Sequence, residues 1–272
     1  MSNQTPSPAD RNPSAPPPNS APIAIAGHHI AKRFGHVQAL SDANVTVHVG
    51  EVVALFGDNG AGKSTFLKTL LGMEKPDSGD FIVADKPVHF ESIRDAQELG
   101  VEAVHQDLAL APELSVVDNM FFGHEILKGG FLRAFGVMNR GGMTELADAA
   151  LRDLGIKLPS LTVPIRDLSG GQKQGVAVAR AVMWGHTAIL MDEPTAALGA
   201  RQSEIVCELM RTVAGRGLGV LVVSHDLPRV LKVADRVTIL WRGATALETA
   251  ASGLTVPDVV ATMVGYTKEN AA

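Results

Sequence analysis

The sequence predicts an α/β fold in which helices cover both faces of a parallel sheet. Short, fully apolar runs recur along the chain and alternate with segments of helical spacing, a pattern typical of buried parallel strands. These runs are residues 52–56, 188–191 and 220–223, and a last run at 237–240 contains one polar residue, Thr238. Between the first and the second run, residues 92–180 have a mainly helical pattern, which indicates a helical insert in the sheet-forming core.

The first part of the chain combines an extension with two strand patterns. Residues 1–22 hold seven of the 15 prolines and no apolar segment, so we expect a disordered extension rather than a secretory signal. Residues 23–34 form a short strand-like segment, and valines alternate with polar residues over 45–49. A first helix is expected over 66–71, then a turn at 76–79 and a strand at 81–83.

Capping residues and glycines divide the rest of the chain into helices and loops. Ser92 and Ser115 each open a helix, and Gly100 ends the first of them. A glycine-rich loop is expected over 128–143 and a helix over 144–154 that Gly155 ends. Further helices are expected over 176–183 and 200–213, and residues 251–272 are expected to be a C-terminal tail.

Composition excludes several classes of protein. The 272 residues carry a net charge of −5 and no long basic run, which disfavours a nucleic-acid-binding protein. Cys207 is the only cysteine, so an intrachain disulfide is impossible. No apolar stretch is long enough to span a membrane. We therefore expect a protein that works in water and reaches a membrane by docking.

A glycine-rich loop follows the first apolar strand and precedes a helix, the order that a phosphate-binding loop requires. Glycines let several backbone N–H groups converge on one point, and the helix adds the positive end of its dipole. Lys63 can reach terminal phosphates, and Ser64 can bind Mg²⁺. The loop consists of Gly57, Asp58, Asn59, Gly60, Ala61, Gly62, Lys63, Ser64 and Thr65.

Two further patterns add to the phosphate-binding loop. The apolar run 188–191 ends in Asp192, which can hold Mg²⁺ through its waters, and Glu193 can polarise an attacking water. A serine and two glycines at 169–171 precede a helix and expose a second set of free N–H groups. That second pattern is weak by itself, because Ser-Gly-Gly also occurs in ordinary linkers.

The order of these motifs resembles the nucleotide-binding subunit of an ATP-binding-cassette (ABC) transporter. The motifs are the phosphate-binding loop, Gln106, Leu168–Gln172, the strand that ends at Glu193, and then His225. The resemblance covers residues 23–245. It implies a P-loop NTPase (RecA-like) core with a parallel sheet, an antiparallel β part and an inserted helical subdomain. The nucleotide-binding domain would span residues 23–250, with the helical subdomain at about 92–180. ATP and Mg²⁺ are the implied substrate and cofactor.

The same resemblance implies a role for each matching residue. Phe34 would stack on adenine, and His225 would contact the γ-phosphate. Gln106 would reach both Mg²⁺ and the attacking water, which makes Ser64, Gln106 and Asp192 the metal ligands. Glu193, His225 and Gln106 would be the catalytic residues. The signature residues would act in trans on the ATP of the other subunit; they are Leu168, Ser169, Gly170, Gly171 and Gln172.

Physical reasoning also favours a dimer. One phosphate-binding loop leaves the outer face of the γ-phosphate in water, whereas hydrolysis needs that charge surrounded and the water positioned. A helix N-terminus from a partner can close that side. We therefore expect a homodimer in which two chains, head to tail, bury two ATP molecules.

The amino-acid sequences of several segments are similar to those of ATPases of carbohydrate importers of the ribose, xylose and fructose class. Residues 194–199 carry one departure from the wider ABC family: Gly199 stands where an aspartate is usual, which removes an expected contact across the dimer. This resemblance implies a transmembrane permease and a periplasmic sugar-binding protein as partners. It places the chain at the cytoplasmic face of the inner (plasma) membrane and implies no nucleic-acid partner.

Two other functions fit the sequence less well. A soluble, non-transport cassette acting on nucleic acid or ribosomes would be expected to carry coiled-coil or zinc-binding insertions or a basic face, and none is evident. A non-hydrolytic regulatory cassette is disfavoured because Lys63, Asp192, Glu193 and His225 are all present.

Overall fold

The structure, a computed structural model, describes residues 21–130, 135–196 and 198–265. The expected disordered extension at 1–22 lies outside the described residues except for its last two positions. Residues 266–272 of the expected C-terminal tail also lie outside them.

Ten strands of the described chain form one sheet, in the order β5-β4-β1-β2-β10-β9-β3-β8-β7-β6. The strands β9, β3, β8, β7 and β6 run parallel to one another, as the apolar runs predicted, and β9 pairs antiparallel with β10 on its other side. The other part is mainly antiparallel. The bounds are β1 Ile23–Phe34, β2 Val37–His48, β3 Val52–Gly57, β4 Ser78–Val83, β5 Lys86–Val88, β6 Val101–Val104, β7 Ala188–Asp192, β8 Gly219–Val223, β9 Arg236–Trp241 and β10 Ala244–Ala250.

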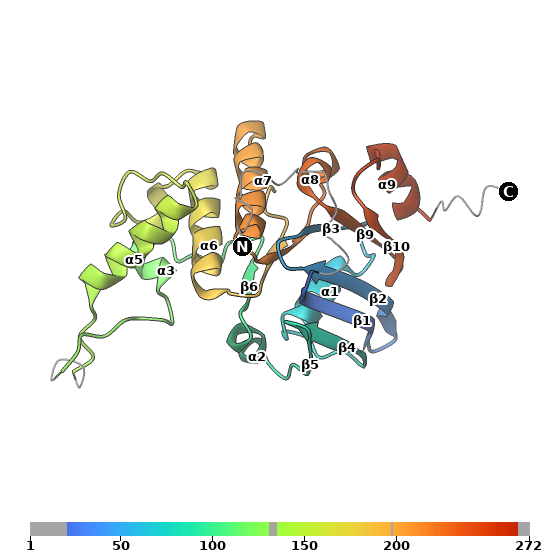
Figure 1. Cartoon of the computed structure of the whole chain (residues 1–272), viewed down its shortest axis with the longest axis horizontal. Helices are drawn as coiled ribbons and strands as arrows, with labels where there is room; N and C mark the ends of the chain where they lie inside the picture. Colours follow the sequence, from blue (N-terminus) through green and yellow to red (C-terminus); the bar gives the residue numbers. More distant parts are fainter. Residues whose placement is uncertain (1–20, 131–134, 197, 266–272) are drawn as a thin grey trace, which may run out of the picture.

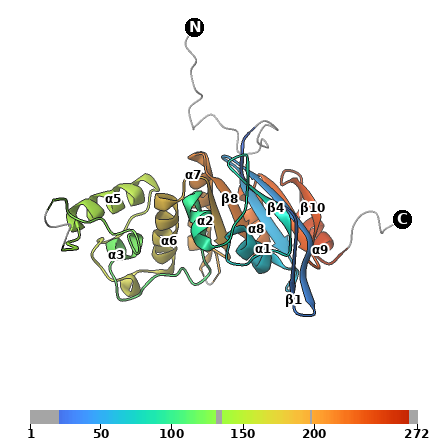
Figure 2. The same cartoon turned by 90° about the horizontal axis from the view of Figure 1, so that it is seen from below.

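The helices cover the sheet on both faces (Figure 1). Helices α7, α8 and α9 line one face, and α1 lies on the other face with the antiparallel strands (Figure 1). Helices α3, α5 and α6 stand together beyond the β6 edge of the sheet (Figures 1 and 2). The bounds are α1 Lys63–Leu70, α2 Ile93–Glu98, α3 Val116–Met120, α5 Arg140–Asp153, α6 Gly170–Trp184, α7 Ala200–Gly215, α8 Leu227–Val233 and α9 Val256–Met263, with a short 3₁₀ helix at Ile165–Asp167.

Strand β3 shows why the sheet has two covered faces. Its residues are all buried, and they alternate between two hydrophobic clusters. Val52, Ala54 and Phe56 pack in the cluster with α6 and α7, while Val53 and Leu55 pack in the cluster with α1. Successive side chains of a strand point to opposite faces, so a continuous apolar run is what a strand buried on both faces requires.

The structure differs from the expected ranges in three places. Residues 101–104 form strand β6, which pairs with β7, so part of the 92–180 segment belongs to the core sheet. Helix α5 begins at Arg140 rather than after residue 143, because Asn139 caps it by accepting a hydrogen bond from the N–H of Gly142. The expected tail contains helix α9, whose Val259 is fully buried against the core.

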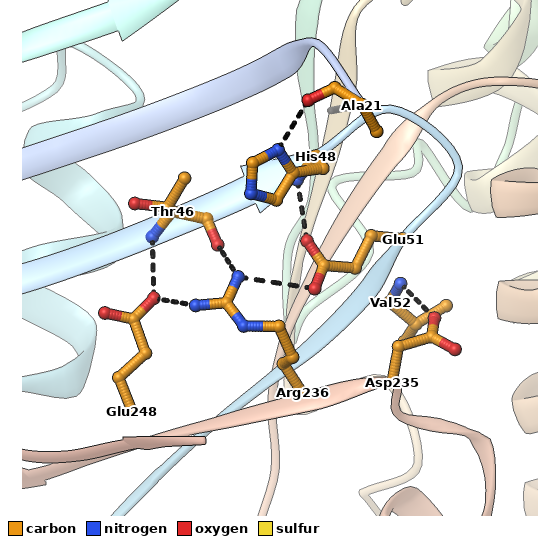
Figure 3. Close-up of polar contacts among 8 residues, drawn as sticks. All are labelled: Ala21, Thr46, His48, Glu51, Val52, Asp235, Arg236 and Glu248. Carbon is orange, nitrogen blue, oxygen red and sulfur yellow. Dashed lines mark hydrogen bonds and ion pairs between the residues drawn. The ribbon is translucent and has the colours of Figure 1, made fainter. Parts of the chain in front are cut away.

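A polar cluster joins β2 of the antiparallel part to β9 and β10, four residues along β2 from the single pair that β2 and β10 form. Arg236 of β9 donates to the carbonyl of Thr46 on β2 and forms ion pairs with Glu51 and Glu248 (Figure 3). Glu51 is fully buried and also accepts from the N–H of His48 at 2.7 Å. Burial raises the pKa of Glu51, which the charge of Arg236 opposes.

Candidate functional site

The carboxyl ends of four neighbouring parallel strands meet at one edge of the sheet and open into a cleft of about 840 Å³. Strand β3 leads into the loop of Gly57–Thr65, β7 ends at Asp192, β8 is followed by His225, and β6 leads to Gln106. The cleft is lined by Val37, Gln38, Ala39, Asn59, Gly60, Gly62, Lys63, Ser64, Thr65, Gln106, Asp192, Glu193, Thr195, Ala196, Val223, His225, Asp226 and Pro228. Such an edge is where open α/β sheets bind ligands.

The shape of the loop after β3 depends on glycines that leave no room for a side chain. A Cβ at Gly57 would lie 2.6 Å from the carbonyl oxygen of Leu240. A Cβ at Gly62 would lie 2.7 Å from the carbonyl oxygen of Ala39, and its φ of +104° disfavours other residues. Gly243 in the β9–β10 turn supports the loop by donating its N–H to the carbonyl of Ala61 at 2.9 Å.

Lys63 is the first residue of α1 and is buried within the loop. Its Nζ donates to the carbonyl of Gly57 at 2.7 Å and to that of Asp58 at 3.0 Å. Burial lowers the pKa of Lys63, an effect opposed first by the charge of Glu193 and then by Asp58 and Asp192. The ammonium group therefore sits where an incoming anion would replace carbonyl oxygens as its partner.

Asp192 and Glu193 form an acidic pair at the end of β7. Burial raises the pKa of both carboxyls. The backbone N–H of His225 donates to Oε2 of Glu193 at 3.1 Å, and Nε2 of His225 lies 3.2 Å from Oε1. Glu193 has a φ of +48°, an unfavourable backbone conformation for a residue other than glycine, which occurs most often at functional sites.

Gln106 is exposed in the cleft, on a turn that follows β6. Its loop is closed by the N–H of Leu108, which donates to the carbonyl of His105 at 2.9 Å. The oxygens of Ser64, Gln106 and Asp192 thus line one cleft, and hydroxyl, amide and carboxylate oxygens are the hard donors that Mg²⁺ accepts. This set of residues fits the expected metal.

The signature residues lie apart from the cleft. Of the described residues that line it, none comes from 168–172. Ser169 caps α6 and is exposed. Its Oγ accepts from the N–H of Gln172 at 3.3 Å, and the backbone N–H of Ser169 donates to Oε1 of Gln172 at 2.9 Å. The N-terminus of α6 is thus formed and open to solvent, as a group acting on another chain requires.

Phe34 also lies outside the lining of the cleft. Its ring is exposed, and Nζ of Lys32 lies 5.1 Å from the ring centroid. Phe34 pairs with Val37 across the β1–β2 turn, and Val37 does line the cleft. The ring is therefore next to the cleft at its rim. Gly57, Asp58 and Ala61 are likewise absent from the lining, and Asp58 and Ala61 line a separate hollow beside Trp241 and Arg242.

Gly199 is the residue at the N-cap of α7. Its N–H donates to Oε1 of Gln202 at 2.9 Å. Gln202 therefore holds the start of α7 from within the helix. The expected contact across a dimer has no side chain to make it at this position.

No role was predicted from the sequence for several residues in or beside the cleft. Thr195 and Ser224 are buried beside the acidic pair, with their hydroxyl oxygens 3.4 Å apart, and the Oγ of Ser224 accepts from the N–H of Asp226. Val37 and Gln38 come from the start of β2. Only their place directly after a strand end or after Phe34 could have pointed to them, because single Ser, Thr, Val and Gln residues occur throughout a chain of this kind.

A second groove of about 330 Å³ lies between α2, β6 and α6, on the other side of the loop that carries Gln106. Three exposed apolar side chains line it: Met73, Ile93 and Phe122. His124 stacks on Trp184 in its wall, with the ring centroids 4.1 Å apart. None of the helices in the described part of the chain has the length and apolar character needed to cross a membrane.

Comparison with known proteins gives consistent matches. The family model described as ABC transporter matches residues 40–196. The chain is 43% identical to the fructose import ATP-binding protein FrcA of Rhizobium meliloti, over 89% of this chain and 94% of that protein. It is 41% identical to the xylose/arabinose import ATP-binding protein XylG of Sulfolobus acidocaldarius, over 87% and 92% of the two chains.

Solved structures show the same fold. A nucleotide-free ATP-binding cassette of an ABC transporter superposes with a TM-score of 0.76 at 24% identity, over 90% of this chain and 98% of that one. A bacterial ABC transporter cassette described as dimeric superposes with a TM-score of 0.69 at 25% identity, over 85% and 100% of the two chains. The predicted α/β fold class, with its added β part and helical subdomain, is confirmed.

Proposed function

Because the chain belongs to the ABC transporter family, an ATP-hydrolysing family, we propose that it is the ATPase subunit of an importer that carries a sugar across a membrane. One observation carries the proposal. The phosphate-binding loop, the acidic pair and His225 line a single cleft in a chain that matches sugar import ATP-binding proteins along nearly its whole length.

Binding of ATP depends on the loop between β3 and α1. The N–H groups at the start of α1 and the glycine-rich loop would surround the phosphates, and Lys63 would exchange carbonyl oxygens for phosphate oxygens. Phe34 at the rim would stack on the adenine, with Val37 beside it. Ser64, Gln106 and Asp192 would hold Mg²⁺, which neutralises charge on the phosphates.

Hydrolysis requires an attacking water and a base. Glu193 is the base in this proposal, because its carboxylate is held at the edge of the cleft by His225. Gln106 orients the water from the opposite side of the cleft, and the side chain of His225, which is half exposed, faces the terminal phosphate. Burial around Glu193 strengthens these interactions.

We expect the working form to be a homodimer. The signature residues of one chain would close the cleft of the other, since Ser169 and Gly170 are exposed and the signature residues lie outside their own cleft. Two head-to-tail chains would then bury two ATP molecules, and hydrolysis would release the interface. Gly199 contributes no side chain to this interface.

The groove between α2, β6 and α6 would receive a transmembrane permease. Its exposed apolar rim is formed by Met73, Ile93 and Phe122, and aromatic and methionine side chains are enriched at protein interfaces. The subunit would be peripheral, on the cytoplasmic face of the inner membrane. Selectivity for the sugar would reside in the permease and a periplasmic sugar-binding protein, without a nucleic-acid partner.

Co-purification with turnover assays tests this function. The tagged chain is expected to recover a multi-spanning membrane protein, and the complex in proteoliposomes is expected to accelerate ATP hydrolysis when a sugar and its binding protein are added. Glu193→Gln serves as the inactive control. Recovery of ribosomes or DNA instead would contradict import, and background ATP turnover with intact binding would indicate a non-hydrolytic cassette.

A further inference from the structure

Arg180 connects the helix that starts at the signature residues to the loop that carries Gln106. It lies about three turns along α6 from Ser169. Its guanidinium donates from Nη1 to the carbonyl of Ala109 at 2.7 Å and from Nη2 to the carbonyl of Leu108 at 3.0 Å. One side chain thus holds two consecutive carbonyl groups of the loop.

The backbone of that loop needs an external support. Leu108 has a φ of +62° and Ala109 a φ of +44°. Neither residue is glycine, so this left-handed conformation is unfavourable and persists only where the surroundings hold it. Within the turn, the N–H of Ala109 donates to Oδ1 of Asp107 at 3.3 Å, and Arg180 supports the turn from outside by binding the carbonyl groups of Leu108 and Ala109.

The other end of the loop is held by the helical subdomain as well. Asn119 of α3 is buried; its Oδ1 accepts from the N–H of Ala111 at 2.7 Å, and its Nδ2 donates to the carbonyl of the same residue at 3.0 Å. The loop from Gln106 to Ala111 is therefore fixed to α3 and α6, whereas Lys63, Asp192 and His225 belong to the core sheet and its loops.

We propose that Arg180 is a positioning residue that fixes Gln106 to helix α6, so that Gln106 and the signature residues move as one body. The inference rests on the proposed function, in which Gln106 orients water in its own cleft and Ser169 acts on the partner's ATP. A movement of α6 then changes both sites together. Arg180 also lines the groove proposed for the permease, beside Glu102 and Trp184.

A guanidinium is well suited to binding the two carbonyl groups of Leu108 and Ala109. Its planar fork presents two donors to two neighbouring carbonyls, whereas lysine offers a point charge on a flexible stem. Burial lowers the pKa of Arg180, and the charge of Glu102 opposes this shift. Arg180→Lys should therefore keep the charge next to Glu102 and lose the paired contact.

The test uses steady-state ATP hydrolysis and equilibrium ATP binding by the full chain. Arg180→Met is expected to lower kcat by about 10–100-fold while the Kd for ATP stays within about twofold, with Arg180→Lys in between. The decisive variant is Arg180→Met combined with Gln106→Ala. Its kcat should match that of Gln106→Ala alone within about twofold, because a residue that acts through Gln106 has nothing left to position.

Arg152→Met is the matched control, since Arg152 pairs with Asp148 on the exposed side of α5 and contacts no residue of the loop. It should keep wild-type kcat. Additive losses in the double variant, or an unchanged kcat in both Arg180 variants, would overturn the inference while leaving the proposed function intact. If Arg180→Met fails to fold, the same comparison with Arg180→Lys decides. A wild-type chain without ATP turnover would instead overturn the proposed function.

Discussion

His225 holds Glu193 at two points. Its backbone N–H donates to Oε2 at 3.1 Å, and its Nε2 lies 3.2 Å from Oε1. The N–H of Glu193 in turn donates to the carbonyl of Val223 at the end of β8. The carboxylate is thus oriented by the neighbouring strand before any substrate is bound, which favours a role in positioning and activating water.

Glu193→Gln tests the role of this carboxylate as the base. Glutamine keeps an oxygen that can accept from the N–H of His225 but cannot take a proton. We expect ATP binding within about twofold of wild type, turnover reduced by about 10²–10⁴-fold, and a dimer that persists with ATP in size-exclusion chromatography. Glu204→Gln on the exposed side of α7 is the control. Wild-type turnover in Glu193→Gln would remove Glu193 as the base.

His225→Gln tests the electrostatic part of the same contact. Burial raises the pKa of Glu193, and the charge of His225 lowers it. Without that charge the pKa of Glu193 rises, so the base form is populated only at higher pH. We expect a lower kcat and an acid limb shifted to higher pH in kcat profiles measured from about pH 5 to 9. An acid limb that stays in place would contradict this coupling.

Lys63→Ala tests the phosphate-binding loop. The variant loses the one buried ammonium that reaches from α1 into this loop and can exchange loop carbonyls for phosphate oxygens. We expect the Kd for ATP to rise by at least about 100-fold in a fluorescence or calorimetric titration. Lys86→Ala, on the exposed strand β5, should bind like wild type. Equal affinity in Lys63→Ala would rule out the loop as the phosphate site.

Ser169→Arg tests the action of the signature residues in trans. The exposed N-terminus of α6 would receive a bulky cation in place of a capping hydroxyl. ATP binding to the single chain should be unchanged, whereas ATP-dependent dimerisation and turnover should be lost. The matched variant Ser160→Arg adds the same side chain at an exposed position of the helical subdomain and should be silent. Unaltered turnover in Ser169→Arg would exclude the signature helix from catalysis.

The polar cluster around Arg236 gives a prediction for stability. Arg236→Met leaves the buried carboxylate of Glu51 without its cation and should lower the free energy of unfolding by about 3 kcal/mol. Glu51→Gln should behave differently. A carboxyl whose pKa is raised by folding favours the folded state below its unfolded pKa, and this contribution is lost as pH rises through the folded pKa.

The stability of Glu51→Gln relative to wild type should therefore increase as the pH rises from about 4 to 7, because the neutral side chain avoids the cost of burying a charge. Urea denaturation of Glu51→Gln and of the wild type over this pH range measures the difference in their free energies of unfolding. A Glu51→Gln variant whose deficit grows with pH would show that the ion pair outweighs burial.

The sequence predicted the parts of the fold that depend on continuous local patterns. The apolar strands 52–56, 188–191 and 220–223 were recognisable because burial on both faces requires uninterrupted apolar residues. Strand β10 and helix α9 were not predicted. Strand β10 is amphipathic and only half-buried, and the burial of α9 depends on Val259 meeting a surface formed by distant strands.

The candidate site likewise contains residues that local motifs predict and contacts that only the folded chain creates. Lys63, Asp192 and Glu193 stand in short motifs whose chemistry can be argued from neighbouring residues. The hydroxyls of Thr195 and Ser224 approach each other only because β7 and β8 are adjacent in the sheet. The contact between Arg180 and the Gln106 loop joins residues more than 70 positions apart, which no local pattern encodes.

The tight backbone packing around Gly57 and Gly62 has a thermodynamic consequence. Carbonyl oxygens of Leu240 and Ala39 fill the space where side chains would stand. The strands that carry them, β9 and β2, therefore hold the loop in one conformation. An incoming triphosphate meets a loop whose backbone is already held in place, and little chain entropy is lost when it binds. Affinity is thus supplied by the rigidity of the sheet beneath the loop as much as by the groups that touch the ligand.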